Sequence, residues 1–407
     1  MVKQTLLKNV SAKLNLFLEP ILQVCDKVRQ RFIRQSLWGI LASGSLMVTE
    51  MARGIHDRTT TLDYTAKRLC RQLKGGTWSW RIVQEAYLKS VTPLVGQDTV
   101  VAVDLTDLSK PRGRDFEYLA LVRDGDKDEL KPGYWCIEAY AVTRKETVPL
   151  VLEPFSVDDP KTPSQNIVIL KTLSQLKDRL GTSGIFTFDR GFDSGEVLNC
   201  LLDNKMRFIV RLRGDRHLVL PSGVRMSATD IADRMRNLKK CLRWRAKGRR
   251  YQLHYVGYQE VKLPGRDEPL RLVVSTVPGI DGGTMMLLTN TEVKDFRDAE
   301  KVLRRYGKRW KAEEAIRLLK QEVGLEGFRI RSLRAIKRLV FLAMLAIAFL
   351  MVLSLRTLSL AERVVEVGKP LRRAKGIIGY RLARGMRKLP ARLSRRSLYF
   401  VRGFQNR

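Results

Sequence analysis

Two strongly apolar segments of the chain end in carboxylates, and this pattern restricts the fold more than any other feature. The first is TVVAVDLTDL from Thr99, which carries Asp104, and the second is GIFTFDRGFD from Gly184, which carries Asp189. Apolar runs of this kind are typical of strands that are buried on both faces of a sheet. We therefore expect two buried strands that deliver Asp104 and Asp189 at their ends.

Further elements between these segments and after them predict an α/β domain over residues 96–355. Strands are expected at 134–142, 148–157, 206–214 and 285–290, and a helix is expected at 166–180. Strands in meander order, followed by strands that alternate with helices, indicate a mixed sheet. Residues from about 215 to 283 hold short, turn-rich β segments, which we interpret as an insertion between core elements.

The two flanking regions differ from this domain. Residues 1–95 show apolar residues at helical spacing, with basic residues scattered between them. This pattern fits either a small all-helical DNA-binding domain or a merely solvated basic face, and it singles out no recognition helix. Residues 356–407 form a basic C-terminal region, in which the stretch from Lys369 onward holds thirteen Lys or Arg and no acid.

The charge of the chain indicates a polyanionic partner. The 407 residues include 76 Lys and Arg against 42 Asp and Glu, a net charge of +34. A balance of this size is typical of proteins that bind nucleic acid or an anionic membrane, and small-molecule metabolism does not explain it.

Cysteine and histidine usage limits the compartment and the metal chemistry. The five cysteines are scattered and never form C-x-x-C, which argues against a disulfide framework or a zinc knuckle and favours a reducing cytoplasm. With three separated histidines, a bound metal must be held by carboxylates.

One segment is apolar enough to be a candidate membrane span. The N-terminus lacks the apolar core of a secretion signal. Residues 339–353 are fifteen consecutive apolar residues, and we expect them to form the core helix of a large domain instead of a membrane span.

A helix expected from about Asp295 to Val323 carries the third candidate carboxylate. It contains the spacing Y-x2-R-x3-E-x6-K at Tyr306, Arg309, Glu313 and Lys320. On one continuous helix these four side chains lie within about 60° of one another, and Arg317 shares their side. Cations beside a metal-binding Glu suit a phosphodiester that lies across the metal ions.

Asp104, Asp189 and Glu313 together are candidate ligands for two Mg²⁺ ions. Carboxylates on two strand ends, joined by one from a covering helix, suit such a pair. Two metal ions activate the attacking oxygen and neutralise the leaving oxygen in phosphoryl transfer.

With these motifs the chain resembles the bacterial insertion-sequence transposases of DDE type, in the cut-and-paste branch marked by Y-x2-R-x3-E-x6-K. The resemblance covers about residues 99–345. It rests on VAVDLTDLSK around Asp104, FDRGFD around Asp189, LLTNTEV before the helix, and the helix signature itself. It implies an RNase H-like core with a β-strand insertion between the second Asp and the Glu.

The resemblance also implies roles. Asp104, Asp189 and Glu313 would be catalytic metal ligands for two Mg²⁺ ions, for which Mn²⁺ can substitute. The DNA of the transposon ends would be contacted by Tyr306, Arg309 and Lys320. Arg317 is a further candidate DNA contact because it shares their side of the expected helix. The implied partners are double-stranded transposon ends and target DNA, bound by a homodimer in the bacterial cytoplasm, at the nucleoid, without a membrane.

The chain departs from the family pattern in one strand. Some relatives stack a flipped base on a Trp in the strand before the signature helix, and here that strand begins with Met285 and Met286. Met285 is therefore one candidate for this contact, and Trp244, among cations of the insertion, is the other.

Other classes of protein share part of this pattern. Another RNase H-like metal-dependent nuclease would share the acids but would not need the Tyr-Arg-Glu-Lys side. A tyrosine recombinase is suggested by Tyr399, but none of the three histidines has an Arg three residues later, and a serine recombinase lacks a supporting motif. A catalytically silent DNA-binding regulator would not need the carboxylates.

Overall fold

The computed structural model describes residues 2–55, 60–75, 79–124, 129–162, 164–245, 250–280, 282–368 and 378–389. The chain forms two compact units, each built from segments that are distant in sequence. The first unit comprises Met1–Leu94, Leu105–Val168 and Glu313–Arg407, and the second comprises Val95–Asp104 and Ile169–Ala312. The sequence predicts functional domains with boundaries at residues 95 and 355, and these boundaries stay a prediction.

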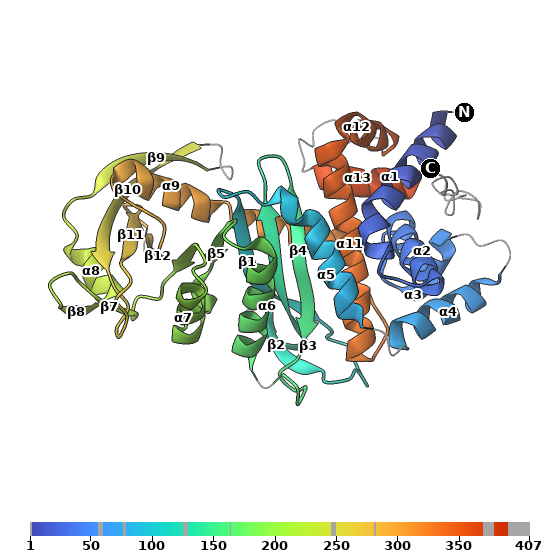
Figure 1. The fold of residues 1–407 in the computed structure, drawn as a ribbon, viewed down its shortest axis with the longest axis horizontal. Coiled ribbons are helices and arrows are strands. Elements are labelled where there is room, and N and C mark those ends of the chain that lie inside the picture. Colours follow the sequence, from blue (N-terminus) through green and yellow to red (C-terminus); the bar gives the residue numbers. More distant parts are fainter. Residues whose placement is uncertain are drawn as a thin grey trace. The chain divides into compact units, whose positions relative to one another are not determined.

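The first unit is largely helical (Figure 1). Its helices are α1 (Val2–Leu22), α2 (Lys27–Ser43), α3 (Val48–Ile55), α4 (Leu62–Lys74), α5 (Trp80–Val91), η1 (Thr92–Leu94), α11 (Leu333–Arg356), α12 (Leu358–Val367) and α13 (Ile378–Lys388). Polar N-caps begin several of them: Asp26 accepts a hydrogen bond from the Arg29 amide, and Thr61 accepts one from Tyr64. The all-helical N-terminal region is therefore present as expected.

Helix α11 contains the fifteen-residue apolar run and lies at the centre of this unit. It contacts α1, α2, α4, α12, α13 and β4, so that it is covered on all sides. By length and hydropathy α11 could cross a membrane, yet 94% of its most apolar window is buried inside the protein. The expectation of a core helix is confirmed, because a helix that is apolar all round needs protein neighbours on every side.

The strands of the first unit form an antiparallel group. β3 (Glu129–Val142) pairs with β4 (Thr147–Phe155) and, through its first residues, with β2 (Ala120–Asp124). The segments 134–142 and 148–157 are strands as predicted, whereas β2 was not predicted. The second half of β1 (Val100–Ser109) also belongs to this unit and neighbours β3.

The second unit contains the mixed part of the sheet. The first half of β1 pairs in parallel with β5 (Ile185–Phe188), which pairs in parallel with β6 (Phe208–Arg211). The next strands are antiparallel, in the order β12 (Thr284–Thr289), β11 (Leu270–Thr276), β10 (Arg250–Val261) and β9 (Lys239–Arg245). The inserted strands therefore extend this sheet through β12.

Shorter elements complete the second unit. Helix α6 (Gln165–Leu180) matches the predicted helix and begins in the first unit, and α7 (Gly195–Asp203) follows β5. β7 (His217–Val219) and β8 (Arg225–Ser227) form a separate two-stranded sheet, followed by α8 (Ala228–Arg234). These short pieces account for the turn-rich character of the insertion.

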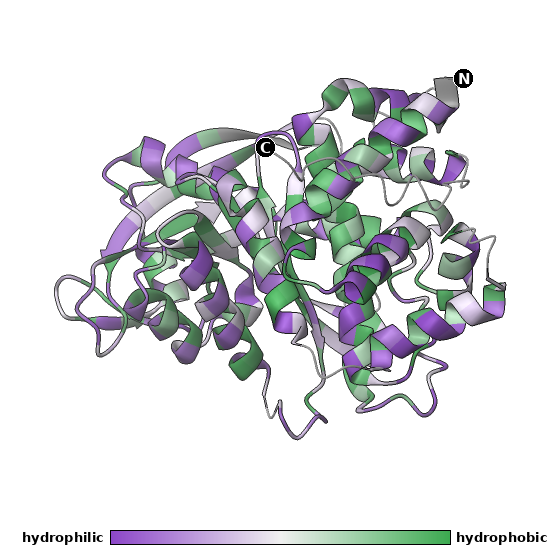
Figure 2. Cartoon of the chain, turned by 45° about the vertical axis from the view of Figure 1, so that its right-hand side comes forward, coloured by the Kyte–Doolittle hydropathy of each residue, from purple (hydrophilic) through white to green (hydrophobic). Residues whose placement is uncertain are grey.

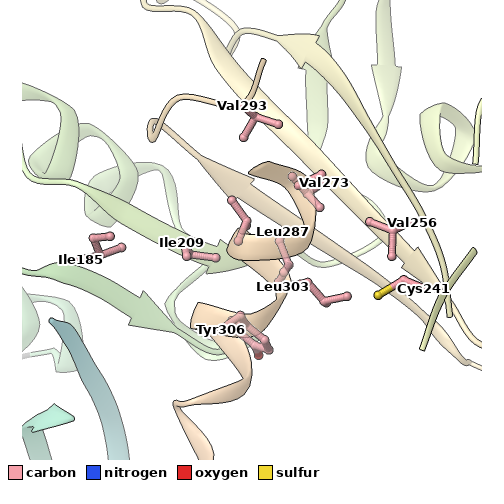
Figure 3. Close-up of a cluster of buried hydrophobic side chains, with 11 residues drawn as sticks. Ile185, Ile209, Cys241, Val256, Val273, Leu287, Val293, Leu303 and Tyr306 are labelled. Atoms are coloured by element: carbon pink, nitrogen blue, oxygen red, sulfur yellow. The ribbon is translucent and has the colours of Figure 1, made fainter. Parts of the chain in front are cut away.

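Helix α9 (Phe296–Gly307) packs on the sheet of the second unit through one apolar side (Figure 3). Its buried residues Ala299, Val302, Leu303 and Tyr306 recur at helical spacing. They contact a cluster of sheet residues that includes Ile209.

The long helix expected from Asp295 to Val323 is wrong as a single element. α9 ends at Gly307, and α10 (Trp310–Glu322) begins three residues later. The amide of Lys308 bonds to the carbonyl oxygens of Arg305 and Tyr306, and that of Arg309 bonds to Tyr306, which are tight turns. Gly307 favours the break because glycine has low helix propensity. The four signature residues therefore do not share one continuous helix.

Candidate active site

Asp104 and Asp189 come at the same level of two neighbouring strands. β1 and β5 are parallel, with Val100 opposite Ile185 and Ala102 opposite Thr187. The same offset of 85 residues, continued along the strands, places Asp104 beside Asp189. Residues at matched positions of parallel strands point to the same face, so the two carboxylates are expected to share one face. Asp189 follows the end of β5 as predicted, whereas the prediction that Asp104 ends its strand is wrong, because β1 continues to Ser109.

The turn after β5 orients Asp189. Asp189 is the N-cap of the short helix η2 (Arg190–Phe192), and its carboxylate accepts a hydrogen bond of 2.8 Å from the amide of Gly191. This bond occupies one oxygen of a half-buried side chain. The second oxygen is oriented by the same bond, because the carboxylate is planar.

Arg309 is the partner of Asp104. Its guanidinium Nη1 donates to Oδ2 of Asp104. The two side chains are only 16% and 14% exposed, so water screens this ion pair little. Arg309 lies in the turn between α9 and α10, and the helix break thus places it against the middle of β1.

Tyr306 supports Arg309 from the core. It is 8% exposed and belongs to the apolar cluster under α9 (Figure 3). Arg309 donates a hydrogen bond to its side chain, and the guanidinium carbon is 6.0 Å from the ring centroid. Burial raises the pKa of Tyr306, against the opposing charges of Arg309 and Arg211, so the phenol stays protonated. Tyr306 is therefore a support for Arg309 and is not displayed to solvent.

The remaining signature residues lie on α10 in the first unit. Glu313 is half-buried in the first turn of α10, and Arg317 is exposed. Lys320 Nζ is 3.2 Å from Oδ1 of Asp107 and 3.2 Å from Oε1 of Glu326. Burial disfavours the charge on Lys320, but these two carboxylates outweigh it and raise its pKa. Lys320 thus has two protein partners.

Asp107 and Asp193, the acids that follow Asp104 and Asp189, have structural partners. Asp107 accepts hydrogen bonds from Lys320 and from the hydroxyl of Ser109. The Asp193 side chain is fully buried and is held by two arginines of the loop after β6. Both carboxylates are used for internal contacts.

Of the two candidates for stacking a flipped base, the structure describes the side chain of Met285 only. Met285 is in β12 and is partly buried against the apolar cluster under α9. Trp244 is in β9, where its backbone pairs with Tyr251, but its side chain lies outside the described part of the structure.

Carboxylate chemistry fits a divalent metal ion at the strand ends. Among the described residues, no group of three or more His, Cys, Asp or Glu side chains is close enough to hold a metal ion. Asp104 and Asp189 nevertheless carry oxygen atoms of the kind that Mg²⁺ prefers as ligands. The guanidinium of Arg309 shows that a cation is accommodated on Asp104.

Comparison with known proteins identifies the family of the chain. The family model for the transposase DDE domain matches residues 96–349, and the chain belongs to that family. The protein is a transposase with a mixed sheet, inserted strands and an N-terminal helical region.

One solved structure is also similar to this chain. It is the cryo-EM structure of a piggyBac transposase synaptic complex with hairpin DNA, at 10% sequence identity and a TM-score of 0.47. The similarity covers 94% of this chain and 76% of the other. No curated protein matches the sequence.

Proposed function

We propose that this transposase binds the two ends of a DNA element, cleaves them by metal-dependent hydrolysis and joins the freed 3′-OH ends to target DNA. The observation that best supports this activity is the matched position of Asp104 and Asp189 on parallel strands. Glu313, in the first turn of α10, is the third carboxylate of this proposal.

Asp104, Asp189 and Glu313 would hold two divalent ions, Mg²⁺ or Mn²⁺. When bound, such ions activate the attacking oxygen and neutralise the leaving oxygen in phosphoryl transfer. Before they bind, Arg309 balances the charge of Asp104. Tyr306 holds Arg309 close to Asp104, because the buried Tyr306 side chain accepts a hydrogen bond from Arg309.

Arg309 has a second task in this proposal. A guanidinium binds phosphate as well as carboxylate, with similar fork geometry. Arg309 exchanges Asp104 for a phosphate of the transposon end when DNA binds, which releases the carboxylate for metal binding. Arg317, exposed on α10, and Lys320 add cationic contacts to the same DNA.

Helix α4 is the proposed DNA-reading element of residues 1–95. Its exposed residues Tyr64, Lys67, Arg71 and Lys74 follow one another at helical spacing and define the α4 basic face. This face borders a cavity of about 890 Å³ that also contacts α3. Along α4, hydrophobic and hydrophilic residues alternate, as expected of a helix with one buried side (Figure 2). A helix of about 10–12 Å diameter fits the major groove.

The test is a cleavage assay on DNA that carries the element ends, in Mg²⁺ and in Mn²⁺. Glu313→Gln, Asp104→Asn and Asp189→Asn should each abolish cleavage and leave end binding intact. Asp98→Asn is the matched control, because Asp98 precedes β1, is 79% exposed and pairs with Arg305. Retained cleavage by Glu313→Gln would contradict the assignment of Glu313.

The same assay separates the alternatives. Wild-type binding without cleavage in either metal would favour a silent regulator, and cleavage without end joining would favour another RNase H-like nuclease. A homodimer in the DNA complex, a hairpin intermediate and base flipping by Met285 or Trp244 belong to this proposal as well. Light scattering of the protein with and without end DNA tests the homodimer.

A further inference from the structure

A second cationic cavity lies in the second unit, formed by residues that the proposed cleavage reaction does not use. Its volume is about 310 Å³, and it lies among the start of α7, the loop after β6 and strand β8. Three arginines line it, Arg213, Arg216 and Arg225, together with His217 and one carboxylate, Asp215. Cations therefore outnumber acids on its wall.

A buried carboxylate fixes two of these arginines. Oδ1 of Asp193 accepts a hydrogen bond of 2.7 Å from Nε of Arg216, and Oδ2 accepts one of 2.8 Å from the amide of Arg213. Both guanidinium groups also donate to the carbonyl oxygen of Asp193, at 2.7 Å from Arg216 and 3.4 Å from Arg213. The loop is thus held in place, and ordering it on ligand binding costs little entropy.

Arg225 completes the cavity from the opposite element. It belongs to β8 and is exposed, and its side chain has no hydrogen bond or ion pair within the described part of the chain. A guanidinium that lines a cavity without a protein partner is available to an anion. This differs from Arg216, which Asp193 neutralises.

The rest of the wall suits a phosphate with its sugar. Gly195, the first residue of α7, lines the cavity, and the positive end of a helix adds to the attraction for an anion. Leu198, Leu263 and Pro264 give the wall an apolar part, against which sugar carbons can pack.

We propose that this cavity binds a backbone phosphate of DNA, at a position separate from the strand ends that carry Asp104 and Asp189. The phosphate class follows from Arg225, whose guanidinium can bind phosphate through paired hydrogen bonds, beside the two arginines that Asp193 holds in place. The choice of DNA as its source rests on the proposed function.

The experiment measures two ligands on the full chain. The first is a random-sequence DNA duplex, with affinity determined at several salt concentrations. Arg225→Ala should weaken binding about three- to tenfold and lower the salt slope by about one phosphate contact. Arg225→Lys should retain most of the slope, because it keeps the charge. Arg297→Ala, an exposed arginine of α9 that does not line the cavity, is the matched control.

The second ligand is inorganic phosphate, compared with chloride at equal ionic strength in a thermal unfolding assay. Phosphate should raise the Tm of the wild type more than that of Arg225→Ala, whose Tm in chloride should equal that of the wild type. An unchanged phosphate shift in Arg225→Ala would overturn the phosphate site. A lost phosphate shift with an unchanged DNA salt slope would overturn DNA as the source. A wild type that binds no duplex would refute the proposed function, while the phosphate measurement would still decide the cavity.

Discussion

The guanidinium of Arg309 occupies the carboxylate of Asp104, although the two residues are 205 positions apart in the sequence. This contact joins the turn between α9 and α10 to the last residue of β1 that belongs to the second unit. Arg309, a residue of the signature, thus has a carboxylate of β1 as its protein partner.

The Arg309–Asp104 pair should be energetically coupled. A double-mutant cycle with Arg309→Ala and Asp104→Asn should give a coupling of about 1–3 kcal/mol in the free energy of unfolding, because both side chains are largely buried. Urea unfolding of the four proteins without added metal measures it. Additive effects would show that the ion pair does not form in solution.

Lys110 should make stability depend on alkaline pH. Its ammonium donates to the carbonyl oxygen of Phe328 at 2.8 Å, and the residue is 8% exposed. Burial lowers the pKa of Lys110 to about 8, although the negative charge of Glu326 acts to raise it. The unfolded chain, with the ordinary value of 10.5, binds more protons between these two values. Stability relative to Lys110→Met should therefore rise from about pH 8 to about pH 10.5, by at most about 3 kcal/mol.

The check is urea unfolding of the wild type and Lys110→Met on both sides of this window. Below about pH 8 both states hold the proton, so the difference between the two proteins should stay constant there. A difference that falls with rising pH would contradict the lowered pKa.

Arg338 should contribute to the stability of the α4 basic face. Its guanidinium, from the buried helix α11, donates to the carbonyl oxygens of Gln72 at 3.2 Å and Leu73 at 3.0 Å, at the end of α4. Arg338→Met should lower the free energy of unfolding by about 2–3 kcal/mol, because these carbonyls lose their buried donor. Lys337→Met is the control, since its partner Glu153 is on β4 and its ion pair is more exposed. Equal losses in both variants would contradict a specific role for Arg338.

Neutralising the α4 basic face should weaken DNA binding with little effect on stability. Lys67, Arg71 and Lys74 are exposed, so replacing all three by Gln should leave the Tm within a few degrees and lower the salt slope by up to about three. Fluorescence anisotropy with end DNA measures the slope. A matched triple substitution on α6, at Lys171, Lys177 and Arg179, should leave the slope unchanged, and a loss there of equal size would argue against a specific α4 surface.

The parts of the fold that follow from local patterns could be predicted from the sequence. The apolar runs at Thr99 and Gly184 predicted β1 and β5, and the offset of 85 residues between them aligns Asp104 with Asp189. The continuous apolar run of α11 predicted a core helix because its length is marginal for a membrane span. These elements carry their signal within a few neighbouring residues.

Features that depend on distant partners could not be predicted in this way. The break at Gly307 was missed because helical periodicity continues across it, and only the contact of Arg309 with Asp104 shows its effect. The α4 basic face was not singled out, since basic residues are spread over all of residues 1–95 and burial alone separates them. The cavity at Arg225 joins three elements whose sequences carry no common motif.

The position of α11 has a consequence for how the chain folds during synthesis. Helices α1, α2 and α4 leave the ribosome first, yet α11, the apolar partner that they contact, is made only after the whole second unit. Until then their apolar sides lack this cover, and such exposed surface promotes aggregation and degradation. A chain that stops before Leu333 is therefore expected to be short-lived in the cell, which would limit the accumulation of truncated, DNA-binding fragments.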